Sequence, residues 1–574
     1  MTTMLGLDKH NNCCVAGSFA LALAACVWAN GAQAQAGLGA RGFDTMRPDI
    51  VPPAPARGQA PADPVLATAA PGVRLPDIAI ADIAITGDAV LGRDVLRDTV
   101  APFAGRPLTL PNLQSLLAAL SAAHRAAGYA IVGLSLPQQD FARGLVIVRV
   151  VRGQISDIVI DGDTEGADLS LLRAHAEAIR NEQPLTRRTL ERRLLLMNDI
   201  PGRKIQARLE PASTVGDARL IITVQRQSVR YGLGLDNLGA RELGDVQLTA
   251  GATVNALLRE GDSTRLTVGM PIGNQRFTYV SARHQQPIGT NGLVASVNYS
   301  LLELRETANS NLHGQASTLG IQLAYPVILR PTMALQVFGG FDMLENRTDL
   351  GRLRAIDEGT RVLRAGAVFA MGNEAGTRNG SLAVVVSQGI DGAGARQRIT
   401  GYGDPAFTKV NFIARLDQVL VRDWLTLRLR GTAQYTGERL PASELVTYGG
   451  VTVGRAFRAA TLYGDRGLTA TATLAMPFRA VLPVDNLASG LGRIGGRMVR
   501  GGEFYAFADY GRTENLPPIA FNRGDRAASV GIGIGMPVAE DTTFNIEVNY
   551  PILRPHYTPT AERPRFVFVF RRNF

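Results

Sequence analysis

From Ser228 to Phe574 the chain repeatedly alternates between apolar and polar residues. In Leu425–Tyr435 the leucines share one parity, while threonine, arginine and glutamine occupy the other. Phe504–Gly511 and Thr543–Tyr550 repeat the pattern. Turn signals rich in glycine, asparagine and aspartate separate such segments. Because a period of two is typical of a β-strand with one apolar and one polar face, the sequence predicts a long series of amphipathic strands.

Two folds could use such strands. A soluble sandwich places the polar faces outside, whereas a membrane barrel places the apolar faces outside and the polar faces around a lumen. A chain of 574 residues is too long for one compact soluble core. After the N-terminus no apolar run reaches the ~18 residues of a spanning helix, which excludes a helical membrane protein. At roughly 20–22 residues per strand and connection, residues 228–574 hold about 16 antiparallel strands.

Arginine supplies most of the positive charge of the chain. The net charge is +10, and the lysines are Lys9, Lys204 and Lys409. The arginines are scattered through the alternating segments instead of forming one basic patch, which argues against nucleic-acid binding. A rigid cation with several donors suits a lumen or an interface.

Residues 1–36 have the features of a secretory signal peptide. Lys9 precedes an apolar core, Cys13–Trp28, and two Ala-x-Ala cleavage sites follow. An alternative is lipidation at Cys26, because Leu23–Cys26 resembles a lipobox. The three cysteines all lie in this core, so we expect neither a disulfide scaffold nor a thiol nucleophile in the mature chain.

Residues 37–76 form a proline-rich linker. Residues 77–227 then hold two copies of one β-α-α-β-β pattern, 77–153 and 154–227. In the first copy we expect a strand at Ile78–Thr86, followed by helices near Arg93–Val100 and at Leu110–Ala127. Each copy spans about 75 residues, enough for a small two-layer α+β domain.

No constellation for catalysis or metal binding emerges. The histidines of the expected mature chain lack metal-ligand spacing: His124, His175, His284, His313 and His556. The chain has no Walker loop, no Gly-x-Ser-x-Gly elbow and no His-Glu-x-x-His. We therefore expect no enzyme activity, no cofactor and no metal.

The glycine-rich stretch Gly449–Leu468 carries a resemblance to a known family. It contains one motif-like segment, Gly454, Arg455, Ala456 and Phe457, and then a second, Gly464, Asp465, Arg466 and Gly467. Together they resemble the sixth extracellular loop of two-partner secretion transporters of the haemolysin secretion/activation type (TpsB). The family motif is usually Val-Arg-Gly-Tyr/Phe, so Ala456 stands where glycine is usual. Phe507, Asp509 and Gly511 resemble the Phe-x-Asp-x-Gly strand motif of the family.

The resemblance implies an outer-membrane barrel of about 16 strands preceded by two periplasmic POTRA domains. It implies that Arg455 reaches into the lumen and pairs with Asp509. Phe574 ends an alternating strand and resembles the terminal signal that outer-membrane barrels present to the barrel assembly machinery. In related proteins a helix before the linker plugs the barrel, and residues 37–76 are a candidate plug segment.

The resemblance also implies a function. The POTRA domains would capture an unfolded, haemolysin-like or adhesin-like exoprotein in the periplasm, and the barrel would conduct it to the cell surface. One alternative is a factor that inserts other barrels into the membrane, although such factors commonly carry more POTRA repeats. A plain porin is a second alternative, but a porin needs no repeated N-terminal modules. The sequence leaves open which exoprotein is exported and whether the transporter also activates it.

Overall fold

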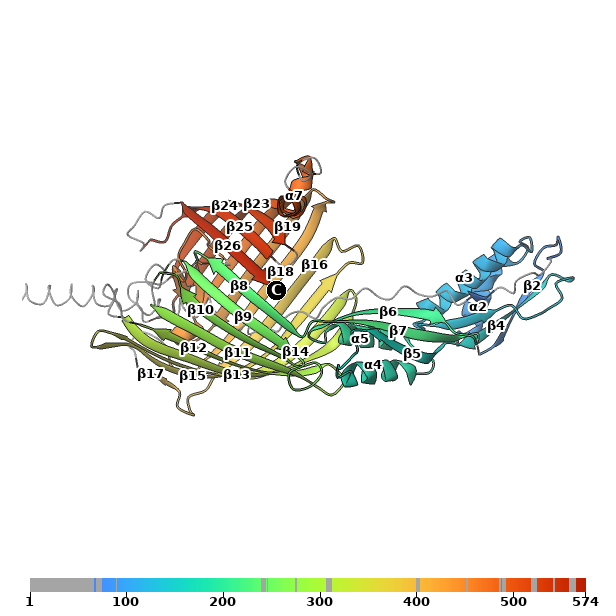
Figure 1. Cartoon of the computed structure of the whole chain (residues 1–574), viewed down its shortest axis with the longest axis horizontal. Coiled ribbons are helices and arrows are strands. Elements are labelled where there is room, and N and C mark those ends of the chain that lie inside the picture. The colour runs from blue at the N-terminus through green and yellow to red at the C-terminus, as the bar shows by residue number, and fades with distance from the viewer. Residues whose placement is uncertain are drawn as a thin grey trace, which may run out of the picture.

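The computed structural model describes residues 67–68 and 75–573, apart from 89, 239–243, 245, 274–275, 306–311, 399–402, 451–452, 485–486, 488–491, 518–523, 540–541 and 557–563. The expected signal peptide, most of the linker with its candidate plug, and Phe574 lie outside these residues. The described chain forms two small α+β units followed by a large barrel (Figure 1).

The first unit packs two helices against one sheet. Its elements are β1 Ala67–Thr68, β2 Asp82–Gly87, α2 Arg93–Val100, the 3-10 helix η1 Ala101–Phe103, α3 Leu110–Ala126, β3 Val132–Ser135 and β4 Leu145–Arg152. The sheet order is β1-β3-β4-β2. Apolar residues at helical spacing on α3, including Leu113, Leu116 and Leu120, are buried against the sheet. The expected strand at Ile78–Thr86 is shorter than predicted, because the amide of Ile80 and the carbonyl of Ile78 bond the backbone at 106 and 108 instead.

The second unit repeats this order with its own core. Its elements are β5 Gln154–Gly162, α4 Ser170–Arg180, α5 Arg187–Asn198, β6 Arg203–Pro211 and β7 Asp217–Arg226. The sheet order is β5-β7-β6, so β6 is an edge strand. Leu172, Ile179 and Leu190 from the helices pack on Leu220 and Ile222 of the sheet.

The two units are joined without a flexible linker. Only Gly153 separates β4 from β5, and a Cβ at this position would lie 2.3 Å from the carbonyl oxygen of Ile131. The Ala130 amide donates to the Leu185 carbonyl at 3.0 Å. Ile131 of the first unit is itself part of the core of the second. These contacts fix the orientation of one unit on the other.

His175 on α4 gives the second unit a testable dependence on pH. The side chain is almost fully buried, and this burial, together with the nearby Arg193 charge, lowers the pKa of His175 to about 4. In the unfolded chain the pKa is near 6.5, so unfolding takes up a proton as the pH falls below that value. The stability is therefore complete above about pH 6.5 and is lost as the pH falls toward 4.

We expect the free energy of opening of α4 to drop by about 2 kcal/mol between pH 7.5 and pH 5, as measured by hydrogen exchange in the full chain. The matched variant is His175→Leu, which removes the titrating group while leaving His124 in place. An equal drop in this variant would show that His175 does not cause the effect.

Among the described residues sixteen antiparallel strands close into a barrel, in which β26 pairs with β8. The strands are β8 Val229–Asp236, β9 Gln247–Asn255, β10 Ser263–Pro271, β11 Phe277–Ile288, β12 Leu293–Leu304, β13 Leu312–Arg330, β14 Met333–Leu350, β15 Leu353–Gly372, β16 Arg378–Gly389, β18 Thr408–Val421, β19 Leu425–Thr436, β22 Arg466–Pro477, β23 Glu503–Glu514, β24 Gly524–Ala539, β25 Thr542–Leu553 and β26 Arg565–Asn573. A two-residue strand, β17 Arg396–Gln397, adds to β15. The predicted barrel and its strand number are confirmed.

The two faces of each strand match the alternation of the sequence. On β25 the apolar Val548, Tyr550 and Ile552 are exposed on the outside, whereas Glu547 and Asn549 are buried on the inside. This is the arrangement of a membrane barrel and the inverse of a soluble sandwich. None of the helices among the described residues is long and apolar enough to cross a bilayer.

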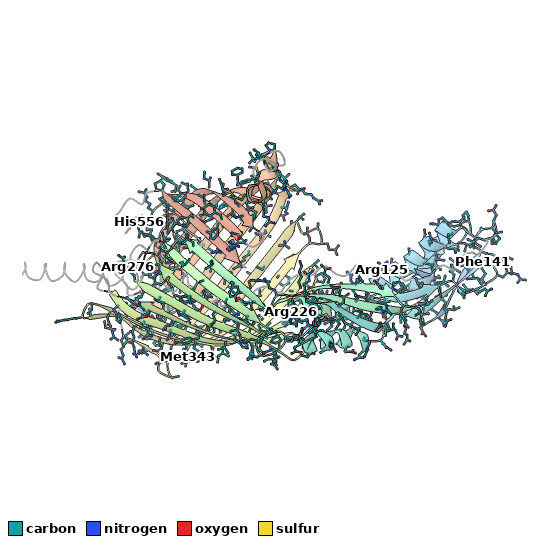
Figure 2. The ribbon with its side chains drawn as sticks, in the orientation of Figure 1. Arg125, Phe141, Arg226, Arg276, Met343 and His556 are labelled. Carbon is teal, nitrogen blue, oxygen red and sulfur yellow. The ribbon has the colours of Figure 1, made fainter. Side chains whose placement is uncertain are left out.

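Shorter elements lie in two of the connections. Between β19 and β22 these are the 3-10 helix η2 Ala442–Glu444, β20 Val446–Tyr448 and β21 Leu462–Gly464. Between β22 and β23 they are the 3-10 helix η3 Phe478–Ala480 and α7 Gly492–Gly501. Figure 2 shows Arg226, the last residue of β7, where the second unit meets the barrel, and shows His556 at the opposite end.

The second unit is bonded to the turns at its end of the barrel. The carboxylate of Glu260, in the β9–β10 turn, accepts hydrogen bonds from the amides of Leu171 and Leu172 at the start of α4, at 2.6 and 3.2 Å. Arg192 on α5 donates to the carbonyl of Asn291 in the β11–β12 turn. Leu196 of α5 packs against apolar residues at the ends of β13, β14 and β15. The second unit and three hairpins of the barrel are therefore one packed body.

Candidate functional site

The connection between β19 and β22 spans residues 437–465, and its described part, all but 451–452, folds back into the barrel; we call this connection the lumen loop. Its strands β20 and β21 pair with each other, Val446 opposite Gly464 and Tyr448 opposite Leu462. Tyr448, Phe457 and Leu462 are fully buried together. The ring centroids of Tyr448 and Phe457 are 5.8 Å apart. A small apolar core of this kind holds the loop in one conformation inside a polar lumen.

The Arg455 side chain joins this loop to the wall of the barrel. Its Nη2 lies 3.3 Å from Asp509 Oδ1 on β23, and its Nη1 lies 3.0 Å from Glu547 Oε1 on β25. The guanidinium carbon lies 3.2 Å from the centroid of the Phe507 ring, a cation–π contact. One arginine thus bonds two carboxylates and one aromatic ring, an arrangement that its planar five-donor group permits.

Asp509 is fully buried and serves as the acceptor for several parts of the loop and wall. The backbone amides of Gly454 and Arg455 donate to its Oδ2 at 3.0 and 3.1 Å. The hydroxyls of Thr471 and Ser529, on the two neighbouring strands, donate to it at 2.8 and 3.3 Å. Because several donors bond one buried carboxylate, the hydrogen-bonding capacity of Asp509 is satisfied by the loop and the neighbouring strands.

Gly511 makes room for this packing. A Cβ at Gly511 would lie 2.2 Å from the Tyr448 ring, and a Cβ at Gly454 would lie 2.6 Å from the same ring. A methyl group at either position would collide with the buried tyrosine. In this chain, the glycine of the Phe-x-Asp-x-Gly strand motif is therefore needed because any side chain at its position would collide with Tyr448.

Ala456 occupies the position where related loops carry glycine, yet no strain arises there. The positive φ of the segment, +70°, lies at Gly454, and the Ala456 side chain is buried in the loop core. The family motif predicts backbone freedom at the residue after Arg455, whereas in the structure the positive φ lies at the residue before it.

The second motif segment lies apart from Arg455, where the loop returns to the wall. Asp465 accepts hydrogen bonds from the amides of Leu440 and Leu516, both at 2.8 Å. Arg466 Nε donates to the Thr436 carbonyl at 2.6 Å. A Cβ at Gly464 or Gly467 would lie 2.7 Å from a backbone oxygen of β23. This segment fastens the exit of the loop and does not contribute to the Arg455 cluster.

A second buried ion cluster, which sequence reasoning did not find, holds the entrance of the loop. Glu444 Oε1 lies 2.8 Å from Arg364 Nη2 on β15, and Glu444 Oε2 lies 2.8 Å from Lys409 Nζ on β18. Arg364 also bonds Asp342 at 2.6 Å and Ser387 at 2.7 Å. Glu444, Arg364 and Lys409 are all almost fully buried. The lumen loop is therefore fastened to the β14–β18 wall as well as to the β23–β25 wall.

The comparisons with known proteins agree with this architecture. Residues 216–536, more than half of the chain, match the model of the haemolysin secretion/activation protein family ShlB/FhaC/HecB. Residues 78–153, the first α+β unit, match the POTRA domain of ShlB type.

Individual relatives agree with the family match. The heme/hemopexin transporter protein HuxB of Haemophilus influenzae is 22% identical over 486 residues, which cover 80% of each chain. The outer membrane transporter CdiB of Dickeya dadantii is 24% identical over 394 residues, covering 65% of this chain and 68% of that one. The solved structure of CdiB from Escherichia coli covers 100% of both chains with a TM-score of 0.66 and 16% identity, which shows a shared fold. The chain therefore belongs to the ShlB/FhaC/HecB family and is an outer-membrane transporter of two-partner secretion, with its POTRA domain in the periplasm.

Proposed function

We propose that the second α+β unit is a second POTRA domain, and that both units capture an unfolded exoprotein before the barrel conducts it outward. The observation that carries this proposal is the open edge of β6. Within the described residues β6 pairs only with β7, and it belongs to a unit bonded directly to the barrel. An extended peptide can add to such an edge through backbone hydrogen bonds, which give affinity with little dependence on sequence.

The side chains of β6 suit such a role. Ile205 and Leu209 face the core, whereas Lys204, Gln206 and Arg208 are exposed along the strand. Charged side chains on an edge discourage edge-to-edge association of folded sheets, and the backbone N–H and C=O groups of the edge are what an added peptide would bond. The units would thus bind an unfolded chain without binding each other.

In the same proposal, the lumen loop with Arg455 and Asp509 sets the open state of the barrel, and transport needs no enzymatic step of this chain. Phe574 and the surrounding lipid would serve assembly, with the barrel assembly machinery recognising the terminal strand. A barrel-insertion factor is the alternative. Coexpression with a large repeat-rich exoprotein encoded beside this chain distinguishes the two, because only a secretion pore delivers that protein to the culture medium.

Cross-linking tests the edge directly. We expect a photoreactive group attached to Gln206→Cys on β6 to capture the exoprotein during export. The same group on Arg173→Cys, exposed on α4, is the matched control and should capture little. Equal capture at both positions, or none at Gln206→Cys while secretion continues, would contradict capture at the β6 edge.

A further inference from the structure

Three neighbouring strands of the barrel, β13, β14 and β15, are 19, 18 and 20 residues long, whereas β8, β9 and β10 have 8 or 9 residues. A tilted strand needs only about 9–11 residues to cross a bilayer. Leu329, Ala334 and Ala370 pack on α5, so these ends of the long strands lie at the periplasmic side. The surplus length therefore projects from the opposite end of the barrel, at the cell surface (Figure 1).

The outward face of this projection changes from apolar to charged over a short distance. On β13 the outward side chains of Leu323 and Leu319 are exposed and apolar. Leu319 is opposite Met343 on β14, which is opposite Arg361 on β15, and Figure 2 shows Met343 at the outer surface. The outward positions that follow toward the cell surface are all charged: Glu345, Arg347 and Asp349 on β14, and Asp357 and Arg354 on β15. At about 3.3 Å per residue, Arg347 lies roughly 13 Å along the strand beyond Met343, at the level of the lipid headgroups.

Three arginines converge on one buried carboxylate in this charged face. Asp357 Oδ1 lies 2.7 Å from Arg396 Nε on β17 and 3.9 Å from Arg347 Nε on β14. Asp357 Oδ2 lies 3.2 Å from Nη1 of Arg398, which follows β17 directly. The Asp357 side chain is 7% exposed, whereas those of Arg347 and Arg398 are 63% and 72% exposed. The buried carboxylate thus holds two guanidinium groups at the surface, and each has five N–H donors.

A second carboxylate fixes this arrangement from behind. Glu345 bonds Arg361, which is almost fully buried, and lies 2.6 Å from Arg396 Nη1. Arg361 also donates to the carbonyl of Ala393, in the connection between β16 and β18, at 3.0 Å. The network is therefore anchored in the fold, while its outer members stay exposed. Because exposed ion pairs contribute little to stability, stability alone does not account for two arginines at this surface.

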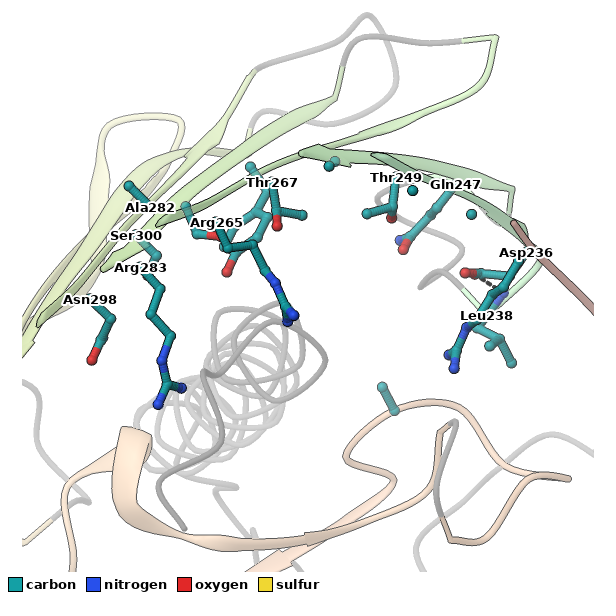
Figure 3. Close-up of a pocket in the computed structure, with 18 of the residues that line it drawn as sticks. Asp236, Leu238, Gln247, Thr249, Arg265, Thr267, Ala282, Arg283, Asn298 and Ser300 are labelled. Carbon is teal, nitrogen blue, oxygen red and sulfur yellow. Dashed lines mark hydrogen bonds between the residues drawn. The ribbon is translucent and has the colours of Figure 1, made fainter. Parts of the chain in front are cut away.

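Arginines elsewhere in the barrel face the lumen. Figure 3 shows Arg265 and Arg283 pointing inward from β10 and β11. On β19 Arg428 bonds Glu503 of β23 on the inner face of the wall, at 2.7 Å. The lipid around a closed barrel does not reach these side chains, whereas it borders the outward face that carries Arg347.

We propose that Arg347 and Arg398 bind the phosphate groups of lipopolysaccharide, the phosphorylated glycolipid of the outer leaflet. A guanidinium group matches the geometry of a phosphate, and hydrogen bonds between two charged groups are stronger than neutral ones. The apolar side chains of Leu319 and Leu323 lie below the arginines on the same outward face, where they would contact the acyl chains of the same molecule. This continuity of an apolar surface with a basic one favours a lipid over a soluble acidic partner. The inference goes beyond secretion, because it concerns the lipid beside the transporter and not the protein that is exported.

The test is the binding of radiolabelled lipopolysaccharide to the immobilised full-length protein in detergent. We expect Arg347→Gln combined with Arg398→Gln to bind the glycolipid roughly tenfold more weakly than the wild type, because charge-assisted bonds to phosphate are lost. Lipopolysaccharide from which the phosphates have been removed should bind the wild type as weakly as the intact glycolipid binds the variant. Unchanged heat-modifiable migration in gels would show that the variant barrel is folded.

The matched control combines Arg265→Gln with Arg283→Gln, which removes the same number of positive charges from the lumen face. Its affinity for lipopolysaccharide should stay near the wild-type value. Equal binding of the intact and the dephosphorylated glycolipid, an equal loss in the control, or displacement of the glycolipid by an equal concentration of inorganic phosphate would overturn the inference. Secretion is measured separately in the culture medium, so a failure of the lipid test is distinguishable from a failure of the proposed function.

Discussion

Arg455→Ala is expected to abolish secretion while the amount of folded barrel in the outer membrane stays close to wild type. The substitution leaves Asp509 buried without its charged partner, and removing one member of a buried pair costs about 3–5 kcal/mol locally. The barrel itself is held by sixteen strand pairings among the described residues, so the loss falls on the position of the loop and not on the fold. Exoprotein in the medium and barrel in membrane fractions are the two measurements.

Asp509→Ala is expected to have the same phenotype, because the amides of Gly454 and Arg455 lose their acceptor together with the guanidinium. The double variant should be little worse than either single variant, since the two residues act as one unit. Arg458→Ala is the matched control, an arginine of the same loop. Wild-type secretion from Arg455→Ala, or additive losses in the double variant, would refute the role of this pair.

Glu444→Gln is expected to release the entrance of the lumen loop and to lower the thermal stability of the barrel. It leaves Arg364 and Lys409 buried with one fewer negative charge, a change that costs about 3–5 kcal/mol when a buried pair is broken. The measurements are the temperature at which the folded band disappears in heat-modifiability gels and the rate of protease cleavage within the loop. We expect a lower transition temperature and faster cleavage.

Two further variants test whether the loss of stability depends on the burial of the ion pair or only on the change of charge. Lys409→Gln added to Glu444→Gln should recover part of the lost stability, because one uncompensated cation is removed while Arg364 keeps Asp342. Arg430→Gln breaks a half-exposed pair with Asp417 and should change stability by at most about 1 kcal/mol. A loss in Arg430→Gln as large as in Glu444→Gln would contradict the importance of burial.

The sequence predicts most of the fold because one rule, the period of two, applies along every strand. The same parity that places Val548 outside places Glu547 inside, so the barrel could be inferred before any tertiary contact was known. Parity also directs Asp509 inward, opposite the apolar positions of β23. The helices of the first unit follow equally well from apolar spacing and from Gly128, whose φ of +94° ends α3.

The rest of the site depends on contacts that no local rule supplies. Glu444 meets Arg364 and Lys409 only because the loop folds inward and the register of β15 and β18 brings both cations to one depth. The available signal was weak: Lys409 is one of three lysines in the chain and stands on a lumen-facing parity. Glu547 joins Arg455 for the same reason, since only the order of strands around the barrel makes β25 a near neighbour of β23.

The junction at Gly153 has a mechanical consequence. β4 runs almost directly into β5 and the second unit is bonded to three hairpins of the barrel, so in the part of the chain that the structure describes both joints of the periplasmic arm are packed. Tension on a polypeptide held by the first unit would therefore be transmitted through the second unit to the part of the barrel wall formed by β9–β15. The exported chain, and not the transporter, would have to bend to reach the entrance of the barrel.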